Sequence, residues 1–208
     1  EPVNSYATDL GLRLQKQLDA MLSETIEIPV IIDGKEYFTG DTGTVVCPHD
    51  HRHVLATWHR AGPKEIALAL ESSRKAWREW SEWPWADRAA IFLKAAELLA
   101  DPYRLILNAA TMLGQSKNTF QAEIDAACET IDFLRFNTFF MTDIYREQPL
   151  SSSNIWNYTE YRPLEGFVFA VTPFNFTSIA ANLPTAAALM GNVAIWKPAT
   201  TSLYSSWY

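Results

Sequence analysis

The chain has 208 residues, of which 48% are apolar and 20% are charged, with a formal net charge of −7. This composition is typical of an ordered, globular protein that is long enough to bury a sizeable core. The acidic balance argues against a nucleic-acid-binding protein, because such proteins usually present a basic face.

We expect neither a membrane helix nor a secretory signal in the sequence as given. No apolar run approaches the roughly 20 residues that a membrane helix needs. The first residues contain neither the basic nor the apolar region of a secretory signal. Two cysteines, Cys47 and Cys128, cannot form a disulfide framework, which favours a reducing compartment.

The first two thirds of the chain are predicted to form a helix, two hairpins and then a series of helices. Residues 7–24 have apolar side chains at helical spacing. Asp33-Gly34 separates two apolar runs and predicts a hairpin over residues 28–38, and residues 45–47 and 54–58 predict a second strand pair. The helical period then predicts helices over residues 63–80, 87–99, 102–114 and 117–142. In the helix over 87–99, Ile91, Ala95 and Leu98 are expected to form one apolar side.

The last third predicts the beginning of a parallel sheet. Residues 154–161 alternate polar and apolar side chains, as an edge strand does. Buried strands over 167–171 and 193–196 flank a helix over 178–190, which Pro184 should kink and Gly191 should cap. This is a βαβ unit with a right-handed crossover. Since one such unit leaves its faces and edges uncovered, we expect the chain to be the front portion of a larger α/β protein.

Polar residues follow both buried strands at the point where ligands bind in open α/β sheets. Asn175 lies in the segment after the first strand, and Lys197 ends the second. Neither a GxGxxG turn nor a P-loop is present, which excludes an ordinary Rossmann fingerprint. From the residues alone, Asn175 is either a turn or cap residue or a donor to a reactive carbonyl, and Lys197 is either a solvated lysine or a ligand donor.

These segments resemble the aldehyde dehydrogenase superfamily. The resemblance rests on the motifs Pro173-Phe174-Asn175-Phe176 and Ile195-Trp196-Lys197-Pro198. The stretches Gln121 to Ala127 and Arg135-Phe136-Asn137 are similar to the branch that oxidises L-glutamate γ-semialdehyde. The implied fold is a helical and hairpin region at 1–150, an oligomerisation-type strand at 151–164 and an incomplete NAD-binding domain at 165–208.

The resemblance implies a role for each residue of these motifs. Asn175 is expected to donate a hydrogen bond to the aldehyde oxygen as negative charge builds there, a contact worth roughly 3 kcal/mol. The expected cofactor-binding residues are Thr172, Pro173, Phe174, Lys197 and Thr200. Many relatives have an acidic residue where this chain has Thr200, so NAD is expected but NADP is not excluded.

The long helix is expected to supply the substrate pocket. The resemblance implies that Glu129 lines this pocket and gates entry, and that Phe133 and Phe176 contact the aliphatic part of the aldehyde. The alternative for Glu129 is an exposed helix face with partial aromatic cover. No metal site is expected, because the Cys47 to His53 segment is a polar turn, and Cys128 matches no nucleophile motif.

The implied activity is NAD-dependent oxidation of L-glutamate γ-semialdehyde to glutamate, through a thiohemiacetal and a thioester. The family's nucleophilic cysteine and general-base glutamate are expected downstream of this chain. The alternatives are an aldehyde dehydrogenase with another substrate, or a catalytically inert binding module. The expected partners are a small aldehyde and further copies of the chain in a homodimer or larger oligomer. The expected location is the cytoplasm of a bacterium or the mitochondrial matrix of a eukaryote.

Overall fold

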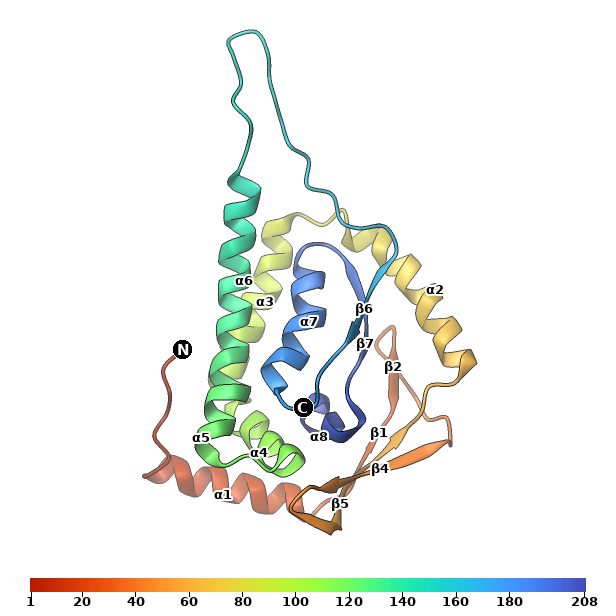
Figure 1. Ribbon diagram of the computed structural model, residues 1–208, viewed down its shortest axis with the longest axis vertical. Helices are drawn as coiled ribbons and strands as arrows, with labels where there is room; N and C mark the ends of the chain where they lie inside the picture. The colour runs from red at the N-terminus through yellow and green to blue at the C-terminus, as the bar shows by residue number, and fades with distance from the viewer.

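The computed structural model describes all 208 residues, and Figure 1 shows helices and small sheets from which one extended arm projects. The helical elements are α1 (Asp9–Leu22), α2 (Pro63–Trp80), α3 (Trp85–Ala100), α4 (Arg104–Gln115), α5 (Thr119–Ala122), η1 (Glu123–Cys128), α6 (Glu129–Arg146), α7 (Thr177–Leu189), η2 (Thr200–Ser202) and α8 (Leu203–Trp207). The strands are β1 (Ile26–Ile28), β2 (Val30–Ile32), β3 (Lys35–Tyr37), β4 (Thr42–Cys47), β5 (Asp50–His59), β6 (Phe167–Val171) and β7 (Val193–Lys197). None of the helices combines the length and the hydropathy needed to cross a bilayer.

Both hairpins predicted near the N-terminus are confirmed. Asp33 and Gly34 have φ angles of 55° and 69°, so the left-handed turn that joins β2 to β3 matches the twist of the two strands. Strands β4 and β5 pair antiparallel. The parallel pairing of β1 with β5 was not predicted, and it places Ile28 in a three-stranded sheet of order β1-β5-β4 instead of the first hairpin.

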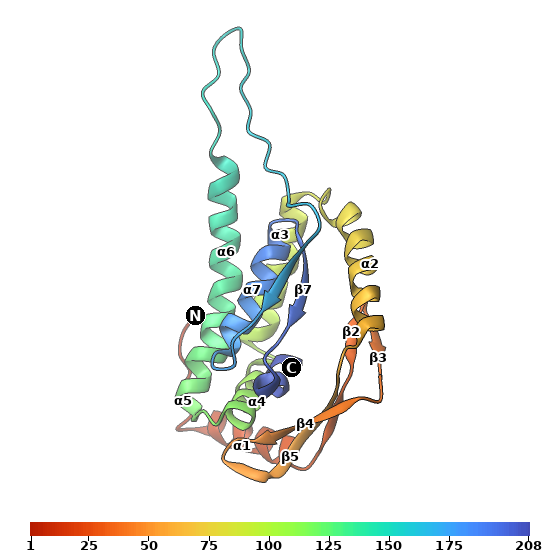
Figure 2. The same cartoon turned by 45° about the vertical axis from the view of Figure 1, so that its right-hand side comes forward.

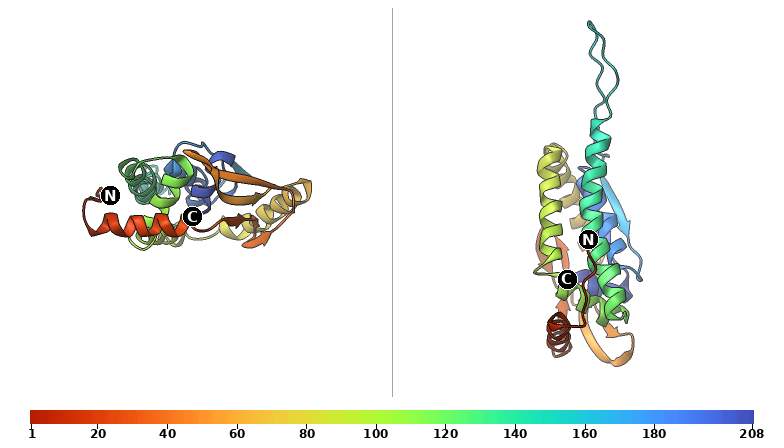
Figure 3. Two further views of the ribbon diagram at one scale, coloured as in Figure 1. Left: turned by 90° about the horizontal axis from the view of Figure 1, so that it is seen from below. Right: turned by 90° about the vertical axis from the view of Figure 1, so that its left-hand side faces the viewer.

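Two apolar clusters form the core. One joins α1, α4 and α8 to the three-stranded sheet, and the other joins α3, α6 and α7. In Figure 3, α1 lies at the opposite end of the molecule from the arm. The first cluster contains Leu14, Met21, Ile28, Val45, Cys47, Leu55, Ala56, Ala109, Ala110, Leu113 and Tyr204. The second contains Ala89, Phe92, Ala96, Ile131, Leu134, Met141 and Leu189.

The apolar side predicted for α3 is wrong. Ile91 and Leu98 are exposed, whereas Ala89, Phe92 and Ala96 are buried against α6 and α7. Residues 89–93 and 98–100 are apolar on several faces of this helix, so periodicity alone does not choose among them. The small side chains of Ala89 and Ala96 allow the neighbouring helices to approach closely, and this packing selects the buried face.

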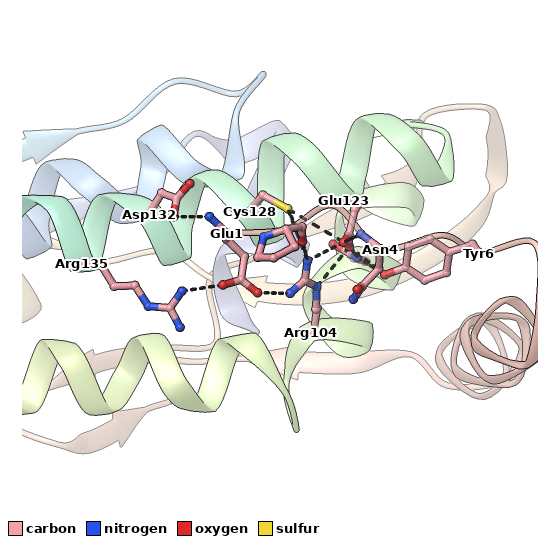
Figure 4. A network of polar contacts seen from close by, with 10 residues as sticks. Glu1, Asn4, Tyr6, Arg104, Glu123, Cys128, Asp132 and Arg135 are labelled. Carbon is pink, nitrogen blue, oxygen red and sulfur yellow. Dashed lines mark hydrogen bonds and ion pairs between the residues drawn. The ribbon is translucent and has the colours of Figure 1, made fainter.

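The long helix predicted over 117–142 contains a π-helical turn, η1, between α5 and α6. Glu123 opens this turn and is fully buried. Its carboxylate accepts hydrogen bonds from Asn4 N (2.7 Å), Tyr6 Oη (2.7 Å), Arg104 Nη2 (2.5 Å) and Asn108 Nδ2 (2.7 Å), as Figure 4 shows for three of these partners. The extra residue of a π-helical turn rotates the helix that follows, so these bonds help to set the face that α6 presents.

The same network holds the first residues of the chain against α4 and α6. Arg104 Nη1 donates to Glu1 Oε1 at 2.5 Å, and Arg135 Nη1 donates to Glu1 Oε2 at 2.5 Å (Figure 4). Burial alone would raise the pKa of Glu123, but the hydrogen bonds from Arg104, Asn4, Tyr6 and Asn108 hold that pKa below its usual value. The charged form of Glu123 therefore stabilises the folded chain.

The predicted βαβ unit is confirmed. β6 and β7 pair parallel, with α7 between them in sequence and packed between this strand pair and α6 in space (Figures 1 and 2). Gly191, at φ 85°, ends α7 in a Schellman motif, in which Gly191 N donates to Ala188 O and Asn192 N donates to Ala187 O. The helix continues through Pro184 without interruption.

The parallel sheet is partial. Phe167, Phe169 and Val171 alternate along β6 and remain exposed, so one side of this strand has little cover within the chain. α2 packs beside β7, away from α7 (Figure 1). An incomplete sheet of this kind agrees with the expected front portion of a larger α/β fold.

The strand predicted over 154–161 is absent. Residues 147–164 form the extended arm beyond the end of α6, clearest in Figure 3, and their only β contact is the isolated bridge between Ser152 and Ile155. Side chains close the arm instead, since Asn157 N donates to Ser151 Oγ at 2.9 Å and Thr159 N donates to Gln148 Oε1 at 2.8 Å. The sequence alternates as a strand does, but the chain supplies no neighbouring strand to form a ladder.

Replacing Glu123 by Gln should destabilise the protein and remove part of its acid sensitivity. Loss of one partner from a buried ion pair costs about 3 kcal/mol or more. Because the pKa of Glu123 is lowered by folding, its contribution is complete above the usual carboxylate pKa of 4.5 and is lost as the pH falls through the lower folded value. Thermal unfolding of the full-length protein between pH 7 and pH 3 measures both effects. Glu97→Gln, which removes an exposed pair with Lys94, is the matched control and should change little. Identical pH profiles for wild type and Glu123→Gln would contradict this prediction.

Candidate functional site

The segments that follow β6 and β7 begin at the same edge of the sheet. Val171 pairs with Lys197, and Thr172 N donates to Lys197 O at 3.2 Å. Because the strands are parallel, their carboxyl ends point the same way, and residues 172–177 and 197–200 leave the sheet side by side. This edge is the place where open α/β sheets bind ligands.

Asn175 presents a free side-chain amide near this edge. The residue is exposed, and its only hydrogen bond within the chain is made by its backbone carbonyl. Phe176 is the N-cap of α7, and no side chain caps this helix. The turn or cap role considered for Asn175 is therefore not seen, and its amide N–H groups are available to another molecule.

Five residues at the two strand ends were predicted to hold a cofactor, and they differ in accessibility. Lys197, Thr200 and Phe174 are exposed, and the Lys197 ammonium makes no hydrogen bond within the chain. Pro173 is half-buried. Thr172 is buried, and its hydroxyl accepts a hydrogen bond from Trp196 Nε1 at 2.9 Å. Lys197 is thus the free cationic donor at this edge, while Thr172 fixes the indole that precedes it.

An open groove of about 700 Å³ lies between α6 and the start of α7. Its walls include Glu129, Phe133 and Phe176, the three residues predicted to bind substrate. The remaining lining residues are Asp132, Phe136, Asn137, Phe140 and Ile179. Most of them recur every three or four residues along α6, so helical periodicity from Glu129 would have found them.

Glu129 is partnered within this groove. Its Oε2 accepts a hydrogen bond from Ser178 Oγ at 2.8 Å, and Ser178 is fully buried on α7. A carboxylate beside aromatic rings is costly without a partner, and this hydroxyl supplies one. The groove therefore combines an apolar wall with one carboxylate held in place.

Lys117 is part of the site and was not predicted. Its ammonium donates to the backbone carbonyl of Asn175 and to Asp125 Oδ2, and it lies 4.4 Å from the centre of the Phe176 ring. Burial lowers the pKa of Lys117, and the nearby Glu129 partly opposes that shift. Nothing in the sequence marks this lysine, because its partners lie 8 and 58 residues away and only the fold brings them together.

Neither cysteine bonds to a residue of the two strand ends, since Cys47 contacts His49 and Cys128 contacts Arg104, Pro2 and Glu123. Cys47 Sγ is 3.2 Å from His49 Nε2, and no group of three or more His, Cys, Asp and Glu side chains is arranged to hold a metal ion. Cys128 is buried, and burial followed by the charge of Glu123 raises the pKa of its thiol. A raised thiol pKa is the opposite of what a nucleophilic cysteine needs.

The sequence is similar to a known protein family and to several of its members. The model of the aldehyde dehydrogenase family matches residues 37–208. The chain is 52% identical over 205 residues to a probable Δ1-pyrroline-5-carboxylate dehydrogenase of Schizosaccharomyces pombe, covering 98% of this chain and 37% of that protein. It is 45% identical over 209 residues to the human mitochondrial Δ1-pyrroline-5-carboxylate dehydrogenase, covering 100% of this chain and 37% of that protein.

A solved structure agrees in fold. The Δ-pyrroline-5-carboxylate dehydrogenase from Mycobacterium tuberculosis, in a crystal structure bound with NAD, superposes with a TM-score of 0.97 at 48% identity. The match covers 100% of this chain and 39% of that one, so the chain spans less than two fifths of the length of these relatives. Because the family model covers most of the sequence and the motifs that carry the resemblance lie within the match, the chain belongs to the aldehyde dehydrogenase family.

Proposed function

We propose that this chain forms part of an NAD-dependent enzyme that oxidises L-glutamate γ-semialdehyde, the open form of Δ1-pyrroline-5-carboxylate, to glutamate in proline breakdown. The observation that carries the proposal is the free amide of Asn175, exposed one residue before the aromatic groove. The names of the relatives support the choice of substrate.

Asn175 acts on the carbonyl oxygen of the aldehyde. When a nucleophile adds to the carbonyl carbon, negative charge develops on that oxygen, and a preorganised N–H donor stabilises the charge by about 3 to 4 kcal/mol. The nucleophilic cysteine and the general base belong to the rest of the protein. The complete reaction consumes the aldehyde, NAD⁺ and water and yields the carboxylate, NADH and two protons.

NAD fits the exposed sheet edge because the edge holds a cation with no partner in the chain. Bound NAD supplies the hydride acceptor. The Lys197 ammonium would donate to its ribose hydroxyls, and the backbone of residues 172–174 would border it, while the Thr172 hydroxyl remains engaged with Trp196. Thr200 carries no charge that would repel a 2′-phosphate, so NADP also fits.

The groove selects the aldehyde. Phe133 and Phe176 contact its aliphatic part, and Glu129, held by Ser178, gates entry to the groove. A carboxylate at this place also favours substrates that bear a cationic group over purely apolar aldehydes.

The arm at 147–164 is proposed to bind a second copy of the chain in a homodimer or larger oligomer. Trp156 and Tyr158 are 80% and 61% exposed, and their rings stack with centroids 5.3 Å apart. Large exposed aromatic groups of this kind mark interaction surfaces. The proposed compartment is the cytoplasm in a bacterium and the mitochondrial matrix in a eukaryote, which fractionation of the source cells would test; several relatives are named mitochondrial.

The full-length protein should form NADH with glutamate γ-semialdehyde in preference to an aldehyde that lacks the charged end. We expect kcat/KM to be at least about tenfold higher than with propanal, which corresponds to about 1.4 kcal/mol of differential binding. Absorbance at the NADH band measures both rates. Equal rates would remove the substrate assignment but leave the family chemistry, and no NADH with either aldehyde would remove the proposed activity.

Substitutions of Asn175 and Lys197 in the full-length enzyme should affect different kinetic constants, kcat for Asn175 and the KM for NAD for Lys197. Asn175→Ala should lower kcat about 10²-fold or more with little change in the KM for NAD, because the donor acts on developing charge. Lys197→Ala should raise the KM for NAD about tenfold with a smaller effect on kcat, because a charge-assisted hydrogen bond is lost. Each variant is the control for the other. A loss below roughly threefold in kcat for Asn175→Ala would refute its role.

Removing the aromatic side chains of the arm should weaken assembly. The double substitution of Trp156 and Tyr158 by Ser removes the stacked pair, so the full-length protein is expected to sediment as a smaller species than wild type at the same concentration. Leu12→Ser, at a side chain on α1 that is 65% exposed, is the control for lost surface hydrophobicity. An unchanged molar mass in light scattering would show that the arm does not hold the copies together.

A further inference from the structure

Lys117 contacts three parts of the candidate site that lie far apart in the sequence. It follows α4, and its ammonium contacts the backbone of Asn175, the π-helical turn through Asp125, and the face of the Phe176 ring. The carbonyl that it binds belongs to the residue whose side chain is the proposed oxyanion donor. Lys117 therefore bonds to the backbone of Asn175 and leaves the Asn175 side-chain amide free.

The surroundings of Lys117 give this contact unusual strength. The side chain is 17% exposed and that of Asp125 is 6% exposed, so the ion pair is largely removed from water and little screened. Glu129 also acts on the ammonium, since its charge partly opposes the lowering of the Lys117 pKa by burial. A cation 4.4 Å above an aromatic ring is also attracted by the ring quadrupole.

Other groups hold the two ends of the turn that Lys117 binds, since Thr172 Oγ1 accepts from Trp196 Nε1 at 2.9 Å and Thr177 Oγ1 accepts from Gln115 Nε2 at 2.7 Å, but the middle of the turn has fewer contacts. Residues 173–175 form no regular structure, and α7 begins without a side-chain cap. Phe174 is exposed, so packing does not fix this turn either. Between these ends, the bond from Lys117 to the backbone carbonyl is the hydrogen bond that Asn175 makes within the chain, and small misplacements of a donor in an active site are costly.

We propose that Lys117 is a positioning residue, which anchors the Asn175 turn to the π-helical turn through Asp125 and thereby aims the Asn175 amide at the aldehyde oxygen. This inference rests on the proposed function, since it needs an aldehyde oxygen at Asn175. It assigns a role to a residue outside the two strand-end motifs.

A double-mutant cycle in the full-length enzyme tests this role. Lys117→Met keeps the aliphatic stem over Phe176 and removes the ammonium, and it should lower kcat about tenfold with the KM for NAD within about twofold of wild type. In an Asn175→Ala background the same change should lower kcat less than about twofold, because the donor that it aims is gone. Lys94→Met, at an exposed lysine on α3, is the control and should leave kcat unchanged.

The outcomes separate positioning from a purely structural role. If Lys117→Met lowers kcat by the same factor in both backgrounds, or by less than about twofold in the wild-type background, the inference is wrong. Should Lys117→Met fail to fold, Lys117→Gln takes its place in the cycle, since it keeps a polar donor in the buried site, and the same non-additivity is expected. An active wild type with an additive cycle overturns this inference alone, whereas a wild type that oxidises no aldehyde overturns it together with the proposed function.

Discussion

The parallel pairing of β6 with β7 is the constraint on which the candidate site depends. With Val171 opposite Lys197, both strands end at one edge, and the two motifs that follow must leave the sheet as neighbours. A shift of this register by one residue would turn every side chain of one strand to the other face. The strand register therefore places Asn175 and Lys197 at the same edge of the sheet, and side-chain contacts only adjust their positions there.

The second half of the site is set by the long helix, and its orientation depends on buried charge. Glu123 accepts hydrogen bonds from Asn4, Tyr6, Arg104 and Asn108 at the start of the π-helical turn, and Asp125, two residues further, faces Lys117. A straight α-helix over the same residues would carry Glu129 and Phe133 to a different angle. The ion pairs of η1 thus connect the N-terminal segment of the chain with the wall of the groove. Glu123, Asp125 and Lys117 do not themselves line the groove.

Much of the fold could be predicted from local patterns, and the failures share one cause. The Asp33-Gly34 hairpin, the βαβ unit and the Gly191 cap are each determined within a short segment, and all three are confirmed. The buried face of α3, the parallel β1 strand and the missing strand at 154–161 depend on which distant segment packs alongside. The candidate site divides in the same way. Local motifs predicted Asn175 and Lys197 as site residues, whereas Lys117 lies in no motif and is identified only by its contacts in the fold.

Residues 172–177 are bonded to both the sheet and the helices. The first residue of this turn, Thr172, is buried and bonded to Trp196 of the neighbouring strand, which ties the turn to the edge of the sheet. Its later residues, Asn175 and Phe176, are held by Lys117 from the side of the helices, which ties the turn to the groove. Because different elements hold the two ends of this segment, a shift of either element changes the position of the whole turn. A displacement of the π-helical turn would therefore move the Asn175 amide relative to Lys197, so the distance between these two groups depends on the helices as well as on the sheet.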